Sequence, residues 1–444
     1  MKIAFLPIDN RPVCYTLPQI LSNIDGNIEF SIPQRKLLGD LTHPANIDGL
    51  FEWLENLPAQ DTIILSLDTL IYGGLIPSRR GNETLEELKL RLDKLKEILK
   101  TKNAKIFAFS SIMRISNNNY NEEEKEYWAQ YGKKIFEYSY NLHKTGCANT
   151  DVPQEILTDY LETRKRNFEV NKIYLEWQKE DVFEFLVFTK DDCAQYGLNV
   201  KEAQELEALG AYTKTGADEI PLSLLSKSIN KTFKIYPIFL EPDSKSLISN
   251  YEDVSVEMSV KSQIELAGCE ICTDKDDADL ILYINNFIEH QGEIVMKINT
   301  KSFAGEFKTP NKPYMIADVR FANGADNNFV SELLKNKFDD KYFYGYSAWN
   351  TTANTLGSLI CGAKMKFCAQ KYNQANFKKL QITRFLDDWA YQANVRQMLK
   401  KTDENELALL MKEYEQIIFN LFNTNYKVKY SYPWHRLFEV EIWI

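Results

Sequence analysis

Short apolar runs alternate along the chain with longer segments in which apolar residues recur every three or four positions. Such runs predict buried strands, and the three-to-four spacing predicts helices with one apolar face. The alternation of the two predicts an α/β fold. The predicted strands are Lys2–Pro7, Thr62–Leu67, Lys105–Ser110, Phe183–Phe188, Lys234–Leu240, Asp279–Asn285 and Tyr314–Val319, with a further short strand at Tyr344–Tyr346.

Four segments carry the predicted helices that matter most. Glu83 to Lys100 has leucines at three-to-four spacing with charged residues between them. Asn121–Leu142 and Pro153–Lys179 are long, charged and aromatic, and together predict a helical insertion between two strands. From Leu380 onward we expect helix first and irregular structure near Tyr432–Arg436.

Eight strands with intervening helices favour a (β/α)8 barrel similar to a TIM barrel, with a helical insertion and a C-terminal helical region. An open, doubly wound parallel sheet is the alternative. We expect residues 1–360 to form the barrel-like catalytic domain, with its insertion around 120–180, and residues 361–444 to pack on it as a helical extension. No G-x-G-x-x-G or G-x-x-x-x-G-K-[ST] motif is present, so dinucleotide and P-loop sites lose their main support.

The most informative polar feature is the pair Asp191-Asp192, which follows the apolar run Val182–Phe188 by two residues. Two acids at a strand end lie at the sheet edge where α/β proteins collect their chemistry. Side chains alternate along an extended chain, so the two carboxylates can take different roles. One could protonate a leaving group while the other stabilises a charged centre. The alternative interpretation is an Asp N-cap at a strand-to-helix junction.

Polar residues also follow nearly every other predicted strand. In a parallel barrel these strand ends face one side, so we expect them to surround the Asp pair and bind substrate, although each could also be a turn or a cap. These candidates are Asp9, Arg11, Asp68, Tyr72, Arg79, Arg114, Asp218, Glu219, Asp318, Asn323, Trp349 and Asn350.

Composition narrows the classes of function. The chain has 444 residues, with 53 Lys and Arg against 63 Asp and Glu, and a net charge of −10. Nucleic-acid binding needs a basic surface and is not expected. The sequence has no apolar stretch of membrane length and no signal-peptide core, so we expect a cytoplasmic protein without a membrane partner.

Seven irregularly spaced cysteines are typical of free thiols in a reducing compartment. Cys269 and Cys272 form a lone C-x-x-C motif. A zinc site would need a second pair or nearby histidines, and the chain has only four histidines. We interpret the two thiols as buried apolar groups on a short helix.

A pocket of Asp, Asn and Arg with aromatic faces suits a small carbohydrate, and glycosidic cleavage needs two acids. The leading hypothesis is a glycoside hydrolase acting on an amino-sugar-type glycan, with Asp191 and Asp192 as catalytic residues and no cofactor. A divalent-metal-dependent hydrolase or lyase is an alternative, because clustered Asp can hold Mg²⁺ or Mn²⁺. A non-catalytic sugar-binding protein is the second alternative. No G-x-S-x-G elbow supports serine hydrolysis.

A second acid pair, Asp387-Asp388, lies inside an amphipathic helical pattern. Adjacent helical residues point about 100° apart. We therefore interpret this pair as a solvated face or as structure paired with arginine.

A set of segments along the chain carries a family resemblance. They are Leu6–Pro12, Ser66–Leu75, Ile112–Ile115, Asp191–Gly197, Gly216–Glu219, Ala322–Asp326, Trp349–Gly357 and Arg384–Gln392. In this order they resemble an uncharacterised bacterial family, the domain of unknown function DUF4127. The resemblance covers essentially the whole chain and implies no activity.

The Asp pair is also distantly similar to the pair in barrel enzymes that remove N-acetylglucosamine from proteins or cleave hyaluronan-type chains. That resemblance implies that Asp191 orients and stabilises the acetamido group as it attacks the anomeric carbon. It implies that Asp192 is the general acid and then the general base.

Overall fold

The computed structural model describes residues 1–444, which divide into two compact units. Both units are made of segments that are separate in the sequence, and the chain passes between them five times. Unit 1 comprises Met1–Asn10, Glu29–Pro221 and Tyr251–Asp253. Unit 2 comprises Arg11–Ile28, Leu222–Asn250 and Val254–Ile444.

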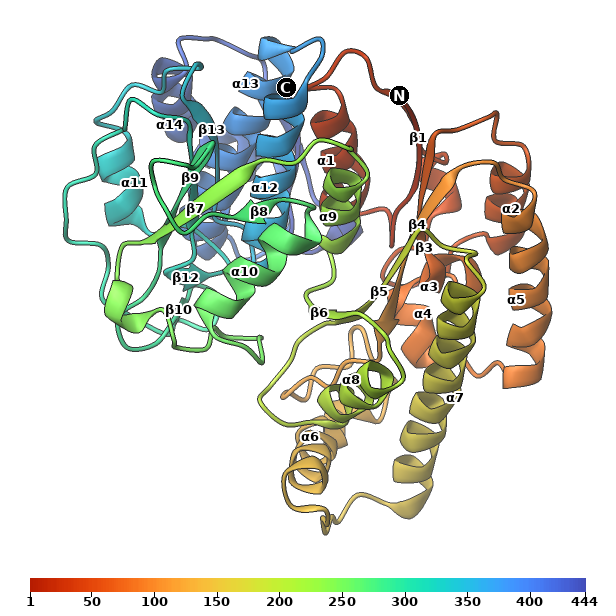
Figure 1. The fold of residues 1–444 in the computed structure, drawn as a ribbon. Coiled ribbons are helices and arrows are strands. Elements are labelled where there is room, and N and C mark those ends of the chain that lie inside the picture. Colours follow the sequence, from red (N-terminus) through yellow and green to blue (C-terminus); the bar gives the residue numbers. More distant parts are fainter. The chain divides into compact units, whose positions relative to one another are not determined.

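Unit 1 is built on a six-stranded parallel sheet in the order β2-β1-β3-β4-β5-β6 (Figure 1). Its central strands are apolar and buried, and β3 is buried at every position, which is typical of parallel sheets. The strands are β1 (Lys2–Leu6), β2 (Glu29–Ser31), β3 (Thr62–Ser66), β4 (Lys105–Ile112), β5 (Phe185–Lys190) and β6 (Thr213–Thr215).

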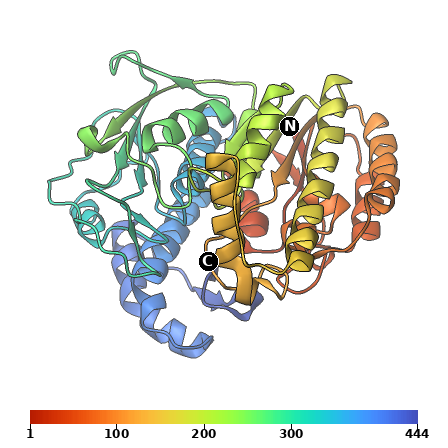
Figure 2. The ribbon, with the colours of Figure 1, turned by 90° about the horizontal axis from the view of Figure 1, so that it is seen from below.

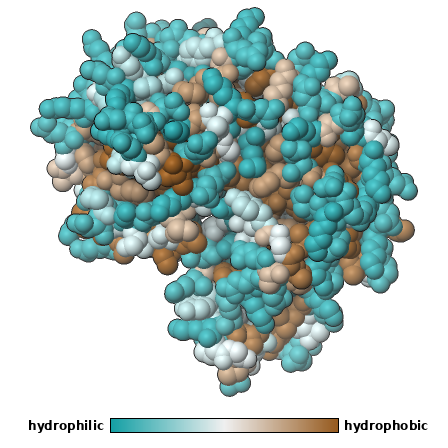
Figure 3. Space-filling model, in the orientation of Figure 1, coloured by the Kyte–Doolittle hydropathy of each residue, from teal (hydrophilic) through white to brown (hydrophobic).

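The helices of unit 1 connect these strands. In α5 the buried leucines follow the predicted spacing, and Thr84 and Glu87 form a capping box at its start. Figures 1 and 2 place α5 (orange) and α7 (yellow) on the same side of the sheet, and much of the visible surface over α7 is hydrophilic (Figure 3). The helices are α2 (Ile47–Glu55), α3 (Leu67–Ile71), α4 (Leu75–Arg80), α5 (Leu85–Lys100), α6 (Trp128–Thr145), α7 (Gln154–Lys179) and α8 (Leu198–Ala208).

The predicted insertion between β4 and β5 is the pair of helices α6 and α7. Trp128 of α6 packs against Tyr160 of α7 with ring centroids 5.7 Å apart, in a buried cluster that also holds Ile135 and Leu157. The first helix begins at Trp128 and not at Asn121 as predicted. The acidic residues before it belong to a loop whose side chains bind arginines, as described below.

Unit 2 is built on a five-stranded parallel sheet in the order β13-β11-β9-β7-β8. Its strands are β7 (Lys234–Phe239), β8 (Glu270–Ile271), β9 (Leu280–Asn285), β11 (Tyr314–Asp318) and β13 (Phe343–Ser347). Two small pairs accompany it, β10 (Gly292–Glu293) with β12 (Phe321–Ala322) and β14 (Lys429–Ser431) with β15 (Glu441–Trp443).

The core of unit 2 forms around α12, which is buried along nearly its whole length. Leu356 and Ile360 of α12 pack with Val260 of α10, Leu282 of β9 and Met315 of β11. The helices of this unit are α1 (Pro12–Ser22), α10 (Val256–Leu266), α11 (Asn327–Leu333), α12 (Thr352–Cys368), α13 (Gln374–Arg384), a π-helix (Phe385–Asn394) and α14 (Glu404–Leu421), and α9 (Ile220–Lys227) begins in unit 1 and ends here.

Helix α1 follows β1 in the chain but belongs to unit 2, where it contacts α12 and α13. The residues after it are tied to the α12–α13 connection. Asp25 accepts backbone hydrogen bonds from Gln370 and Lys371 at 3.0 Å each, and Asn373 donates its backbone N–H to Ile24 O at 2.8 Å. The start of the chain thus completes a unit built largely from its end.

The two sheets share one topology. When the strands of each sheet are numbered along the chain, both follow the order 2-1-3-4-5, and unit 1 adds a sixth strand at the end. This is the order of flavodoxin-like sheets, in which ligands bind beyond the carboxyl ends of the strands.

The α/β class is confirmed, and every one of the eight predicted strands is present. They do not close into the predicted eight-stranded barrel, because they are divided between two open sheets with free edges at β2 and β6 and at β13 and β8. Polar residues after successive parallel strands are common to barrels and open sheets, so the pattern did not distinguish them. No helix is both long enough and apolar enough to span a membrane.

Candidate functional site

The predicted site residues are distributed over both units. Unit 1 holds nine of the fourteen, and unit 2 holds the other five. Those in unit 1 are Asp9, Asp68, Tyr72, Arg79, Arg114, Asp191, Asp192, Asp218 and Glu219. Those in unit 2 are Arg11, Asp318, Asn323, Trp349 and Asn350.

Asp191 and Asp192 leave the carboxyl end of β5 beside the end of β4. The two strands are paired in register up to Ile112 and Lys190, so Arg114, two residues beyond β4, emerges next to the acids. Its Nη1 lies 3.3 Å from Asp191 Oδ2 and 3.2 Å from Asp192 Oδ2. The structure therefore brings together three residues that the sequence placed after two different strands.

The backbone at Asp192 is left-handed, with φ of 43°, a conformation that residues other than glycine rarely adopt. Such strain persists where the surrounding structure enforces it and is frequent at functional sites. Neither acid caps a helix. Helix α8 starts only at Leu198, with Gly197 as its N-cap residue, and the Leu198 N–H is bound by Ser139 Oγ at 2.7 Å. The N-cap interpretation of the Asp pair is thus wrong.

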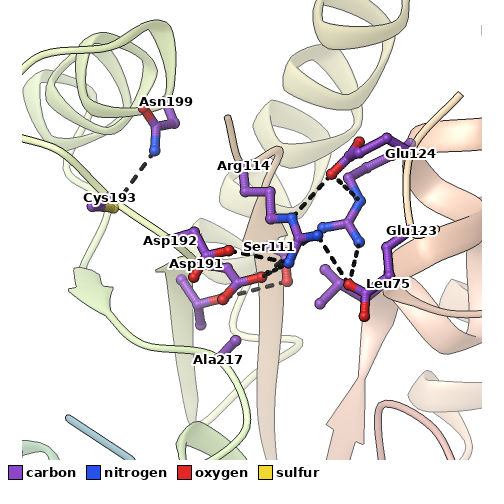
Figure 4. A network of polar contacts seen from close by, with 12 residues as sticks. Leu75, Ser111, Arg114, Glu123, Glu124, Asp191, Asp192, Cys193, Asn199 and Ala217 are labelled. Carbon is purple, nitrogen blue, oxygen red and sulfur yellow. Dashed lines mark hydrogen bonds and ion pairs between the residues drawn. The ribbon is translucent and has the colours of Figure 1, made fainter. Parts of the chain in front are cut away.

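The Asp pair is one side of a larger ionic cluster. Figure 4 shows Arg114 between Asp191 and Asp192 on one side and Glu123 and Glu124 on the other. Arg114 Nη2 lies 2.9 Å from Glu123 Oε2, and its Nε lies 3.0 Å from Glu124 Oε1. We call this group the acid–arginine cluster; it comprises Arg79, Arg114, Glu123, Glu124, Asp191 and Asp192.

Arg79, on α4, is the second cation of the acid–arginine cluster. Its side chain is 1% exposed, and it lies 3.4 Å from Glu123, 3.5 Å from Glu124 and 3.9 Å from Asp191. Its Nε and Nη1 make no hydrogen bond within the protein. The two glutamates were not predicted as site residues, because their Asn-Glu-Glu-Glu run was assigned to a helix.

The charges of the acid–arginine cluster do not balance, since four carboxylates face two guanidinium groups. Burial raises the pKa of Asp192 to about 7, and the charge of Asp191 adds to this effect while Arg114 opposes it. Burial alone would lower the pKa of Arg114, but Glu123, Asp192 and the other carboxylates outweigh it and hold that pKa well above its usual range. Asp192 is therefore a carboxyl group that can hold a proton near neutral pH.

Asp68 and Tyr72 lie deeper in unit 1. Asp68 is in the first turn of α3 and accepts a hydrogen bond from the Ser111 N–H at 2.8 Å, which links α3 to β4. Burial raises the pKa of Asp68 to about 7. Tyr72 lines a separate cavity of about 260 Å³ whose lining includes neither Asp191 nor Asp192, and the Arg166 guanidinium lies 5.4 Å from its ring centroid.

The remaining unit 1 candidates are all buried. Asp9 follows β1, and Glu219 accepts the Ala217 N–H at 3.2 Å. Gly216 has φ of 118°, and a Cβ there would lie 1.7 Å from Glu219 Oε1, so this turn requires glycine. The strained turn at Gly216 is thus stabilised by Glu219, and the substrate-binding role of Asp218 and Glu219 stays a prediction.

In unit 2, Asp318 and Asn323 lie near the carboxyl end of β11. Asp318 accepts hydrogen bonds from Asn285 Nδ2 and from the Asp326 N–H, both at 2.8 Å. Burial raises the pKa of Asp318 to about 8, and the charge of Asp326 contributes. Asn323 and Asn350 are both left-handed, and the Asn323 N–H donates to Asn350 O at 2.8 Å.

Trp349 was predicted to offer a stacking face, but it is only 4% exposed. It lines a small cavity together with Arg384 and Asp387. Arg11 pairs with Glu439 at 3.2 Å, and its guanidinium lies 5.1 Å from the Trp434 ring centroid.

Asp387 and Asp388 are not on a solvated face. Both are buried in the π-helix, and Arg384 pairs with Asp387 at 3.2 Å and with Asp388 at 3.3 Å, as the Arg-paired alternative predicted. Asp388 Oδ2 also accepts the Ala348 N–H at 2.7 Å and so holds the π-helix against the end of β13. Burial raises the pKa of Asp387 to about 7, and Arg384 opposes this shift.

Cys269 and Cys272 are free, buried thiols. They flank the short strand β8 and do not lie on a helix as predicted. Burial raises the pKa of Cys269 to about 12. No group of three or more His, Cys, Asp or Glu side chains has an arrangement that could hold a metal ion.

The raised pKa of Asp318 predicts a pH-dependent stability. A carboxyl whose pKa is higher in the folded state stabilises the fold below its unfolded pKa of about 4, and this stability is lost as the pH rises to about 8. We expect the unfolding free energy to fall by about 1.4 kcal/mol per pH unit over this range through Asp318 alone. The Asp318→Asn variant should lose this slope in urea titrations at pH 5, 6, 7 and 8.

The matched control for that experiment is Asp93→Asn on the exposed face of α5. It should leave the pH dependence as in the unchanged protein. Equal slopes for Asp318→Asn and the unchanged protein would contradict the assignment.

A family model described as "Protein of unknown function (DUF4127)" matches residues 3–443. The chain belongs to this family. The match spans both units, so the DUF4127 region contains both flavodoxin-like sheets. The acid–arginine cluster and the π-helix with Asp387 and Asp388 both lie inside it. A search of curated proteins gave no match to this DUF4127 chain.

Proposed function

We propose that the protein is a glycoside hydrolase in which Asp192 is the general acid and then the general base, and Asp191 is the stabilising carboxylate. The observation that carries this proposal is the placement of both acids against one guanidinium nitrogen of Arg114. Glycosidic cleavage needs two carboxyl groups with different protonation, close enough to act on the same bond.

The environment of Asp192 supports its role as the acid. A general acid works best when its pKa lies near the working pH, and burial together with Asp191 raises the pKa of Asp192 to about 7. Asp191 instead has two arginines within ion-pair distance, Arg114 at 3.3 Å and Arg79 at 3.9 Å. Carboxylates whose surroundings differ in this way are typical of acid and base pairs.

The two carboxylates lie close enough to act on one anomeric centre, since their Oδ2 atoms are 3.3 Å and 3.2 Å from the same nitrogen. Retention of configuration follows from the proposed participation of a substrate acetamido group, because two displacements then occur at the anomeric carbon. In the form of the mechanism that uses a substrate acetamido group, Asp191 would stabilise the charge that develops on that group.

The proposal is tested with a panel of aryl glycosides that includes N-acetylglucosaminides and N-acetylgalactosaminides beside simple hexosides. We expect turnover of an amino-sugar substrate, unaffected by EDTA, with retention of configuration in the first product seen by NMR. The double variant Asp191→Asn/Asp192→Asn serves as the control for contaminating activity and should show none.

Each other outcome of the panel has a defined meaning. Binding of glycans without product on long incubation would favour the sugar-binding alternative. Loss of turnover on adding EDTA, restored by Mg²⁺ or Mn²⁺, would favour the metal-dependent alternative. No turnover of any glycoside, or inversion of configuration, would overturn the proposal.

A further inference from the structure

Unit 2 contains a large cavity that is independent of the acid–arginine cluster of unit 1. A cavity of about 850 Å³ lies between the ends of α11, α13 and α14 and the segment that leads into β13. Sites for small molecules commonly measure about 300–1,000 Å³. Phe338 and Asp340 precede β13, so the cavity is at the amino end of that strand, away from the carboxyl end where Trp349 and Asn350 lie. We call it the aromatic cavity.

The wall of the aromatic cavity is a continuous set of phenylalanine rings. Phe338 stacks on Phe343 with centroids 4.2 Å apart and planes 10° from parallel. The ring centroids of Phe343 and Phe377 lie 6.4 Å apart, and those of Phe338 and Phe422 lie 6.0 Å apart. Phe343 and Phe377 are nearly fully buried, so the partly exposed Phe338 and Phe422 are the rings that a ligand's apolar body would contact.

The charged groups around the aromatic cavity differ in whether they have an ion-pair partner. Asp340 is neutralised, since its Oδ1 lies 2.9 Å from Lys366 Nζ and accepts the Tyr372 hydroxyl at 2.6 Å. Lys335 pairs with Glu332. Lys337 and Lys378 line the cavity and have no carboxylate partner. In a protein of net charge −10, two unpaired lysines on an aromatic cavity are a local positive site.

A buried amide adds a polar point to the apolar wall. Gln381 is 2% exposed and lines the cavity. Its Oε1 accepts the Tyr346 N–H at 2.8 Å, a contact that holds α13 against β13 beside the cavity.

We propose that the aromatic cavity binds an amphipathic carboxylic acid, whose aromatic ring or acyl chain packs against the phenylalanines and whose carboxylate meets Lys337 and Lys378. Apolar area supplies most of the binding, and the two ammonium groups select the anion over a neutral molecule of the same shape. This proposal is independent of the glycosidase proposal, because glycoside hydrolysis does not require a site for a carboxylic acid.

The test is isothermal titration calorimetry of the full chain with 4-phenylbutyrate and octanoate, and with the matched alcohols 4-phenyl-1-butanol and 1-octanol. We expect each acid to bind at least about tenfold more tightly than its alcohol. Stronger binding of 4-phenylbutyrate would identify an aromatic body as the preferred source of the apolar contact, and stronger binding of octanoate an acyl chain.

Three variants localise the binding. Lys337→Ala/Lys378→Ala should weaken the acids about tenfold and leave the alcohols nearly unchanged. Lys412→Ala/Lys427→Ala removes two exposed lysines of unit 2 outside the cavity and should change neither. Ile417→Trp, which places a larger side chain in the cavity, should abolish binding of acids and alcohols while the circular dichroism spectrum stays that of the unchanged protein.

Three results would overturn the proposal. They are no binding of either acid at millimolar concentration, equal affinity for acids and alcohols, and acid binding that the Lys337→Ala/Lys378→Ala variant leaves intact.

Discussion

The Asp192→Asn variant is expected to lose about 10²–10⁴-fold in kcat/KM on glycosides with poor leaving groups, and far less on dinitrophenyl glycosides. A poor leaving group needs a proton as the bond breaks, and asparagine cannot supply one. A dinitrophenolate leaves without that proton, so its departure is nearly insensitive to the substitution. The measurement is a series of aryl glycosides of graded leaving-group pKa.

The pH profile gives an independent readout of the same residue. In the unchanged protein kcat/KM should fall above about pH 7 as Asp192 loses its proton, because burial and Asp191 raise its pKa to that value. In Asp192→Asn this alkaline limb should be absent, and Asp93→Asn should keep it. An equal loss on every leaving group, with the alkaline limb unchanged, would show that Asp192 has only a structural role.

The second large effect is expected from Arg114→Met, which should lower the stability of unit 1 by about 3–5 kcal/mol. Arg114 is the common partner of Glu123, Glu124 and the Asp pair, and its side chain is 14% exposed. Removing it leaves one buried carboxylate, Glu124, and three partly buried ones without their main counter-charge. Because a chain of two compact units need not unfold in one two-state step, hydrogen–deuterium exchange of peptides from β4 and β5 is the appropriate measurement.

The control for that loss is Lys105→Met, which breaks the exposed Lys105–Glu184 pair in the same unit and should change exchange very little. The double variant Arg114→Met/Glu124→Gln should recover part of the lost protection, because one uncompensated charge is then removed. Exchange in Arg114→Met equal to that of the unchanged protein would contradict a stabilising role for Arg114.

Local patterns predicted the elements of this fold much better than their assembly. Apolar runs identified all eight long or central strands, because a buried parallel strand is apolar along its length. They did not reveal β2 or β6, which have three residues each and are partly exposed. The division into two sheets depends on pairing between distant strands, and no linker of distinctive composition marks the points where the chain changes units.

The same distinction applies to the site. The position of Asp191 and Asp192 after a strand was visible in the sequence, and so was Arg114 after the neighbouring one. Their ion pairs depend on the register of β4 and β5, which the sequence pattern does not specify. Glu123 and Glu124 were missed because an acidic run is also typical of a helix start. The burial of Asp387 and Asp388 was missed because the helical pattern around them resembles an exposed face.

The membership of α1 in unit 2 has a consequence for how the protein is made. This helix ends at Ser22 and α12, which it contacts, begins at Thr352, so it leaves the ribosome about 330 residues before its packing partners are synthesised. Domains generally fold as the chain emerges, N-terminal parts first. Here the sheet of unit 1 can assemble while α12 and α13 are still to be made, but the apolar side of α1 lacks its packing partners until they have been synthesised. A chain truncated before α13 would therefore leave α1 without one of the helices that cover it.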